Sequence, residues 1–328
     1  MPGARLSIAM TTYNGTAYIR EQLESFAAQT RPPHELVVCD DVSSDDTVAQ
    51  LEAFAARAPF PVRIERNPTN LTTTPNFAKA IGLCSGDVIF LSDQDDVWLP
   101  GKLAAMGEVF DAEPAVGAAI CNGTVCNEAL EAIGHDLWGA LWFHARERRA
   151  VREGRATEVF AKHVVASGNT LAFRSRYRDL VLPFPDLHDC ADAWIAFLIA
   201  SVAEFRLVEQ PLIRYRVHGK NQFGTRRPGL REQIQRARWQ ISSGLFAHAV
   251  RLFTAIEERL RNADALELRI HPGTLELVGG RIAHFEVRDA MPGNIWQRLP
   301  QVAREIRSGA YWHYSYGVKS IAQDLLLR

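Results

Sequence analysis

The sequence predicts an α/β protein with a mostly parallel sheet flanked by helices, followed by a helical C-terminal extension. Three observations lead to this prediction. Apolar segments of strand length alternate with amphipathic segments four times in roughly the first 90 residues. Polar loops follow three of these strands directly. From residue 222 onward the pattern is mostly helical.

The alternating half contains four predicted strands and three predicted helices. The predicted strands are 6–10, 35–39, 62–65 and 88–91, and the predicted helices between them are 17–28, 47–58 and 75–84. In the first helix Ile19, Leu23 and Phe26 fall on one face, as helical periodicity requires. Residues 88–91 are four apolar residues in a row, which is typical of a strand buried on both faces of a parallel sheet.

The pattern changes after Leu99. The expected elements are a helix to Asp111, a strand at 116–121, a loop entering a strand at 164–173, a strongly apolar helix that ends near 204, and two short strands within 205–217 split at Pro211. We expect two domains, an α/β domain over 1–224 and a mainly helical extension over 225–328.

The three polar loops 11–15, 40–47 and 93–98 each begin where a predicted strand ends. In parallel α/β sheets, ligands bind beyond the carboxyl ends of the strands. We therefore expect these loops to meet at one crevice.

The third loop is strongly acidic, with Asp93, Asp95 and Asp96 in four positions. Carboxylates this dense repel one another unless a cation or hydrogen-bond donors hold them. Asp93 and Asp95 fall on the same side of an extended loop, where both could reach one Mg²⁺ or Mn²⁺ ion. For Asp96 two interpretations stay open: membership of this site, or capping of a helix that starts near Leu99.

Composition and termini exclude several classes of protein. Lys and Arg number 37 against 38 Asp and Glu, so global charge does not indicate a nucleic-acid partner. The five cysteines show no paired spacing, which favours a reducing compartment. Neither a signal peptide nor an apolar run of about 18 residues is present, so the expectation is a cytoplasmic protein.

The chain also lacks the glycine-rich phosphate loops of dinucleotide-binding folds and P-loop proteins. A nucleotide would therefore need a metal for its phosphates. An aspartate of the 40–45 cluster could accept hydrogen bonds from a base or ribose.

Together these motifs resemble an inverting glycosyltransferase of family 2 with the GT-A fold, in its rhamnosyltransferase-like branch, over roughly residues 5–225. The blocks that carry the resemblance are Thr11-Thr12-Tyr13-Asn14, Asp40-Asp41-x-Ser43-x-Asp45 and Asp93-Gln94-Asp95-Asp96-Val97-Trp98. Later blocks that fit are 167–173, 188–194 and 215–224.

The resemblance implies a role for each matched residue. Metal ligands would be Asp93, Asp95 and His218, with a divalent Mg²⁺ or Mn²⁺ as cofactor. Nucleotide contacts would be Thr11, Thr12, Tyr13, Asn14, Asp41 and Asp93. Donor or acceptor contacts would be Trp98, Gly168, Asn169, Thr170 and Asn221.

The resemblance implies that the catalytic base is Asp192 or Asp189, because the family's usual His-Asp pair is followed here by Cys190 and Ala191. Asp192 is preferred, since it precedes the apolar run as the family's base does. Its alternative role is a helix N-cap. The family's processive Gln-x-x-Arg-Trp signature is missing from its expected context, so one sugar per binding event is expected.

The predicted reaction moves one sugar, rhamnose or another hexose, from a dTDP-, UDP- or GDP-sugar to a surface glycan or lipid-linked acceptor. Alternatives are a non-catalytic scaffold of the same fold and, less favoured, a sugar nucleotidyltransferase. The aromatic tail 311–319 could rest on the inner face of the cell membrane, form a homodimer contact or pack internally.

Overall fold

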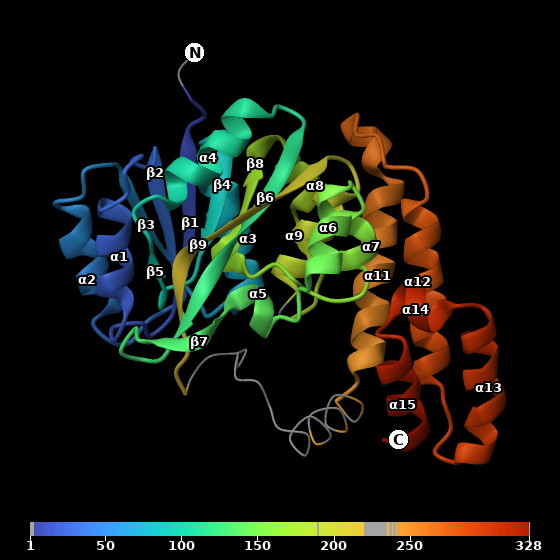
Figure 1. The fold of residues 1–328 in the computed structure, drawn as a ribbon. Coiled ribbons are helices and arrows are strands. Elements are labelled where there is room, and N and C mark those ends of the chain that lie inside the picture. Colours follow the sequence, from blue (N-terminus) through green and yellow to red (C-terminus); the bar gives the residue numbers. More distant parts are fainter. Residues whose placement is uncertain are drawn as a thin grey trace. The chain divides into compact units, whose positions relative to one another are not determined.

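The computed structural model describes residues 3–188, 190–219, 235, 238, 241 and 243–327 (Figure 1). The chain divides into two compact units: unit 1 comprises 1–154 and 165–225, and unit 2 comprises 155–164 and 226–328. The predicted boundary after residue 224 lies outside the described residues, and the two-domain assignment stays a prediction.

Unit 1 is built on one sheet with helices on both faces. Its strands are β1 Leu6–Thr12, β2 Glu35–Asp40, β3 Val62–Arg66, β4 Val88–Ser92, β5 Val97–Trp98, β6 Val116–Cys126, β7 Ala132–Asp136, β8 Leu171–Arg174 and β9 Glu204–Arg216. Its α-helices are α1 Ile19–Ala27, α2 Thr47–Ala55, α3 Thr73–Leu83, α4 Lys102–Ala112, α5 Leu137–Ala140, α6 Ala145–Arg152, α8 Arg178–Val181 and α9 Ala191–Ala200.

The sheet order is β3-β2-β1-β4-β8-β6-β9-β5, with β7 paired to β6. The four strands β3, β2, β1 and β4 run parallel, with Ile8 in register with Leu36 on one side and Phe90 on the other. β8 runs antiparallel between β4 and β6, and β9 returns parallel to β6. The predicted α/β fold with a mostly parallel sheet is therefore confirmed (Figure 1).

Two predicted elements are wrong in detail. α4 begins at Lys102 with Gly101 as its N-cap, so Asp96 does not cap it. The segment predicted as two short strands is the single strand β9, whose register against β6 shifts where Pro211 lies opposite Asn122. Proline has no N–H to donate, and the strand accommodates it by this irregularity rather than by ending.

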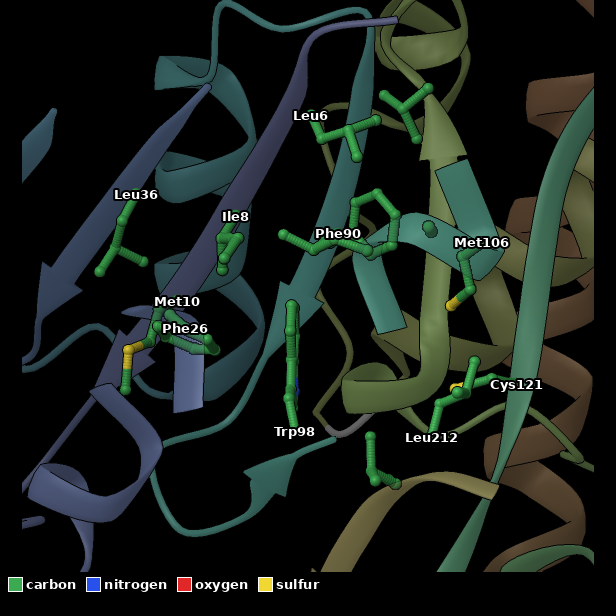
Figure 2. Packing of buried hydrophobic residues seen from close by; sticks show 14 of the residues in the cluster. Leu6, Ile8, Met10, Phe26, Leu36, Phe90, Trp98, Met106, Cys121 and Leu212 are labelled. Atoms are coloured by element: carbon green, nitrogen blue, oxygen red, sulfur yellow. The ribbon is translucent and has the colours of Figure 1, made fainter. Parts of the chain in front are cut away.

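The main core of unit 1 lies between the sheet and α1, α2 and α4 (Figure 2). Trp98 is its centre, with Phe26 at a ring-centroid distance of 4.8 Å and Phe90 at 6.2 Å. Burial of an aromatic or aliphatic side chain of this kind stabilises the fold by about 1.5–3 kcal/mol. α3 packs on β1 and β2 with Phe77 and Ile81 buried, outside this core.

Unit 2 is helical. Its described helices are α7 Ala156–Phe160, α11 Leu245–Arg261, α12 Thr274–Asp289, α13 Ile295–Arg307, α14 Ala310–Tyr314 and α15 Val318–Leu326, with 3₁₀ turn Ala263–Leu266. A buried network joins three of them: Asp324 accepts hydrogen bonds from Arg288 Nε at 2.8 Å and from Tyr311 Oη at 2.8 Å. Among the helices that the structure describes, none is long and apolar enough to span a bilayer. All five cysteines are free thiols and buried.

Candidate functional site

A cavity of about 780 Å³ lies in unit 1 at the carboxyl ends of the parallel strands. The loops after β1, β2 and β4 line it together, as do the loop after β3 and the first turn of α9. The predicted convergence of the three polar loops is confirmed. Predicted site residues on its lining are Thr11, Thr12, Tyr13, Asn14, Asp41, Asp93, Asp95, Asp192 and His218.

Gln94 locks the loop after β1 to the acidic loop. The Tyr13 N–H donates to Gln94 Oε1 at 2.9 Å, and Gln94 Nε2 donates to the Tyr13 carbonyl at 3.0 Å. A Cβ on Gly15 would lie 2.3 Å from Gln94 Oε1, so a larger residue at this position would displace the Gln94 amide. The two cavity walls are thus held in fixed register.

Asp41 holds the loop that follows β3. Its Oδ1 accepts hydrogen bonds from the Leu71 N–H at 2.7 Å and from Asn67 Nδ2 at 2.8 Å. Its Oδ2 accepts from the Thr72 N–H at 2.9 Å. Each carboxylate oxygen can accept two bonds, so Oδ2 keeps capacity for a ligand at the cavity surface.

Three loops at the cavity contain non-glycine residues in the left-handed region. Asn14 has φ 48°, Val42 has φ 65° and Thr72 has φ 69°. This conformation costs about 1–3 kcal/mol, particularly for β-branched side chains, and such strain gathers at functional sites. The strained backbone of these loops is therefore consistent with a functional role for the cavity that they line.

Four carboxylates lie close together at the floor of the cavity. Burial raises the pKa of Asp93 well above its usual range, and Asp95, Asp96 and Asp192 raise it further. Burial, with Asp95, raises the pKa of Asp96 to about 7. Negative charge concentrated this densely favours a cation or a proton donor.

Asp96 is a buried support of the acidic loop. Its Oδ1 accepts a hydrogen bond from the Arg216 N–H at 2.9 Å, and its Oδ2 accepts one from Asn169 Nδ2. The Lys102 ammonium lies behind it, 3.3 Å from the ring centroid of Trp98, and donates to the Asn169 carbonyl. Burial lowers the pKa of Lys102 to about 8, against the opposing effect of nearby acidic groups.

His218 covers the acidic loop from the end of β9. Its Nε2 lies 3.0 Å from Asp95 Oδ2, and its ring stacks on Tyr18 at a centroid distance of 4.7 Å. Arg216 places its guanidinium 4.8 Å from the Tyr18 ring centroid and donates from Nε to the Asp95 carbonyl at 2.8 Å. Tyr18 Oη in turn donates to Glu128.

Asp93, Asp95 and His218 are the candidate ligands for a divalent metal. Asp93 and Asp95 offer hard oxygen ligands and His218 an imidazole, which suits Mg²⁺ or Mn²⁺. Within the described part of the chain, however, no cluster of three or more His, Cys, Asp or Glu side chains is arranged to hold an ion. The donor chemistry suits such an ion, but these side chains do not form a closed site by themselves, so metal binding stays a prediction.

Asp192 lies in the first turn of α9 and lines the cavity. The N-cap of this helix is Cys190, so the N-cap role considered for Asp192 is wrong. Gly168 lies directly against the Asp192 carboxylate, because a Cβ on this glycine would be 3.0 Å from Asp192 Oδ1. Asp189, the alternative base, lies outside the described residues.

Other predicted donor or acceptor residues are buried behind the cavity. Trp98, Asn169 and Thr170 are each at most 1% exposed and do not line it, and Gly168 is also buried. Their direct contact with a sugar stays a prediction. Asn221 lies outside the described residues.

Sequence reasoning missed Tyr18, Glu128 and Arg216. These residues belong to three segments more than 80 positions apart. Tyr18 and Glu128 lie in no motif, and Arg216 lies in the 215–224 block but was given no role there. The loop after β3 could have been predicted to line the cavity, because its run of Asn, Pro and Thr follows directly on a strand end.

The family model described as "Glycosyl transferase family 2" matches residues 7–180, more than half of the chain. The chain belongs to glycosyl transferase family 2. The matched region includes the cavity loops after β1, β2, β3 and β4, and it ends before Asp192 and His218.

The individual relatives are distant in sequence, and the chain covers 66% and 36% of the length of the first curated relatives that it matches. An uncharacterized glycosyltransferase from Nostoc sp., alr2836, is 26% identical over 231 residues, which is 66% of each chain. The crystal structure of S. aureus TarS 1–349 in complex with UDP has a TM-score of 0.54 at 15% identity and covers 98% of this chain and 90% of its own.

A mannosyltransferase from Pyrobaculum calidifontis, PcManGT, solved with GDP-Man and Mn²⁺, has a TM-score of 0.50 at 20% identity over 94% of this chain and 76% of its own. At these identities the solved structures show a shared fold. The predicted GT-A-like architecture with C-terminal helices is confirmed.

The cavity brings together three kinds of chemical group. Backbone groups and polar side chains of three loops offer hydrogen-bond donors and acceptors. The acidic loop and His218 offer carboxylate oxygens and an imidazole. Asp192, at the N-terminus of α9, has a carboxylate favoured by the helix dipole and open to the cavity.

Proposed function

We propose that this glycosyltransferase transfers one sugar, with inversion, from a nucleoside-diphosphate sugar to a hydroxyl of a surface-glycan or lipid-linked acceptor. Rhamnose or another hexose is the proposed sugar. The observation that supports this most is that the loops after β1, β2 and β4 and the Asp192 carboxylate line one cavity in a member of family 2.

The nucleoside would lie against the loops after β1 and β2, near Tyr13 and Asp41. The diphosphate would lie beside Asp93, Asp95 and His218. A bound Mg²⁺ or Mn²⁺ would neutralise charge on the leaving diphosphate. TarS and PcManGT were solved with UDP and GDP-Man respectively, which supports a nucleotide-sugar donor for this chain.

Asp192 would be the general base. Its carboxylate takes the proton of the acceptor hydroxyl as that oxygen forms a bond to the anomeric carbon. The bond from the anomeric carbon to the diphosphate oxygen breaks with its electron pair, and the nucleoside diphosphate leaves. Attack opposite the leaving group inverts the anomeric configuration.

The Asp192→Asn variant tests this assignment. Removal of the base should lower the rate of nucleoside diphosphate release with acceptor by roughly 10²–10⁴-fold, while donor affinity stays near that of the wild type. Rates and donor binding should be measured side by side for Asp192→Asn and for the matched variant Asp189→Asn.

Each outcome has a distinct meaning. Loss of transfer only in Asp189→Asn would move the base to that residue and leave the function in place. A wild-type protein that binds nucleotide sugars but transfers none of them to any acceptor would favour a non-catalytic scaffold.

A further inference from the structure

Helix α13 of unit 2 carries an apolar stripe on its solvent side. The stripe consists of Ile295, Trp296, Leu299 and Ile306, and Trp296 is 76% exposed. At 100° per residue these four side chains fall within about 100° of the helix circumference. A surface helix normally turns a stripe of this width toward the core.

The side of α13 that faces the interior carries the polar Arg298 and Glu305 beside the apolar Val302. Arg298 is 3% exposed and donates from Nη1 to the Asp324 carbonyl at 2.7 Å. Glu305 Oε2 lies 2.5 Å from His284 Nδ1 on α12. These bonds hold Arg298 and Glu305 on the buried side of α13, while Trp296 faces solvent.

The stretch from Met291 to Leu327, which the structure describes throughout, continues the same pattern. Its exposed large apolar residues beyond α13 are Trp312, Tyr316, Val318 and Leu326. Its exposed charged residues are all basic: Arg304, Arg307 and Lys319. Its two acidic residues, Glu305 and Asp324, are buried.

We propose that the α13 stripe binds the surface of an anionic phospholipid bilayer. Trp and aliphatic side chains on one face of a helix, beside Arg and Lys without exposed acidic residues, are the composition of helices that lie in the membrane interface. The basic side chains would meet lipid headgroups while the stripe enters the acyl boundary. A membrane location would bring unit 1 to lipid-linked acceptors.

Vesicle flotation with the full chain tests this, in the absence of nucleotide. Wild-type protein should float with vesicles of phosphatidylglycerol and phosphatidylcholine, less so at high salt, because screening weakens the basic contacts. The double variant Trp296→Glu/Leu299→Glu should bind about tenfold or more weakly per side chain. Both positions are exposed, so folding should persist and can be checked by circular dichroism.

Two further variants sharpen the result. Leu266→Glu, in the 3₁₀ turn of unit 2 and 36% exposed, is the matched control and should float like the wild type. Arg304→Glu/Arg307→Glu should lose binding to anionic vesicles and not to pure phosphatidylcholine vesicles.

The proposal is wrong if wild-type protein stays in solution with anionic vesicles, or if the stripe variant floats as well as the wild type. It is also wrong if the wild type is a dimer that the stripe variant dissociates without any vesicle binding, since the stripe then joins two copies. Because no nucleotide is present, none of these outcomes bears on sugar transfer.

Discussion

Asp192 lines the cavity from the first turn of α9 and lies against Gly168. The first turn of α9 fixes its backbone, the cavity lies in front of its carboxylate, and the Cα of Gly168 lies behind it. A base must lie within hydrogen-bond reach of the hydroxyl it deprotonates. Gly168, predicted as a sugar contact, is thus placed to position Asp192.

Gly168→Ala tests this positioning role. The added Cβ would lie 3.0 Å from Asp192 Oδ1, tighter than most carbon contacts, and would push the carboxylate by a few tenths of an ångström. Displacements of about 1 Å can cost 10²-fold in rate, so we expect kcat to fall about tenfold with donor KM little changed.

The control is Gly82→Ala in α3, where the nearest atom to an added Cβ is Leu182 Cδ1 at 3.9 Å. It should leave both constants at wild-type values. Wild-type kcat in Gly168→Ala would show that this glycine does not position the base.

At the scale of elements, the strands and helices that were predicted correctly are those with a local sequence pattern. The runs 6–10 and 88–91 and the amphipathic segment 17–28 contain their own signal, so β1, β4 and α1 follow from sequence. The α4 start and the continuity of β9 depend on distant partners. Asp96 bonds Asn169 and Arg216 instead of a helix end, and Pro211 is accommodated by a shift against β6.

The candidate site divides in the same way. The loops at strand ends were predictable because parallel strands bring them to one edge. The layer formed by Tyr18, Glu128 and Arg216 was not, because contacts between segments this distant leave no spacing in the sequence. The burial of Trp98 and Asn169 is likewise a product of packing on the finished sheet.

The junction of α12 and α13 gives unit 2 a pH-dependent stability. Burial, with Arg288 and Arg281, lowers the pKa of His284 to about 3 from 6.5. Below about pH 6.5 the unfolded chain therefore binds a proton that the folded chain does not. The free energy of unfolding should fall as pH falls, by up to about 1.4 kcal/mol per pH unit.

Glu305 has the opposite effect on the pH dependence of stability. Burial raises its pKa, so toward pH 5 the folded state binds a proton at Glu305 more readily than the unfolded state does. Denaturant unfolding between about pH 7 and pH 5 measures the net slope. His284→Asn keeps a donor toward Glu305 without titrating there, and its slope should be flatter. Equal slopes in the two proteins would contradict this explanation.

At the scale of the whole molecule, the cavity and the α13 stripe belong to different units. Unit 1 contains the cavity of a family 2 glycosyltransferase, with all its lining residues. Unit 2 presents the α13 stripe. Nucleotide binding should therefore depend on the acidic loop and be unaffected by changes in the stripe.

The central claim is that the cavity binds a nucleotide through the acidic loop and a metal. Thermal unfolding should be measured with nucleoside diphosphates and nucleotide sugars, with and without Mn²⁺, for the wild type, Asp95→Asn and the control Asp46→Asn. Asp46 is exposed at the start of α2 and does not line the cavity.

We predict that one nucleotide class stabilises the wild type and Asp46→Asn by about 2.7 kcal/mol at a hundredfold excess over its dissociation constant, only with metal, and that Asp95→Asn loses this effect. Absence of any shift with dTDP, UDP or GDP and their sugars, with or without Mn²⁺, would contradict the account.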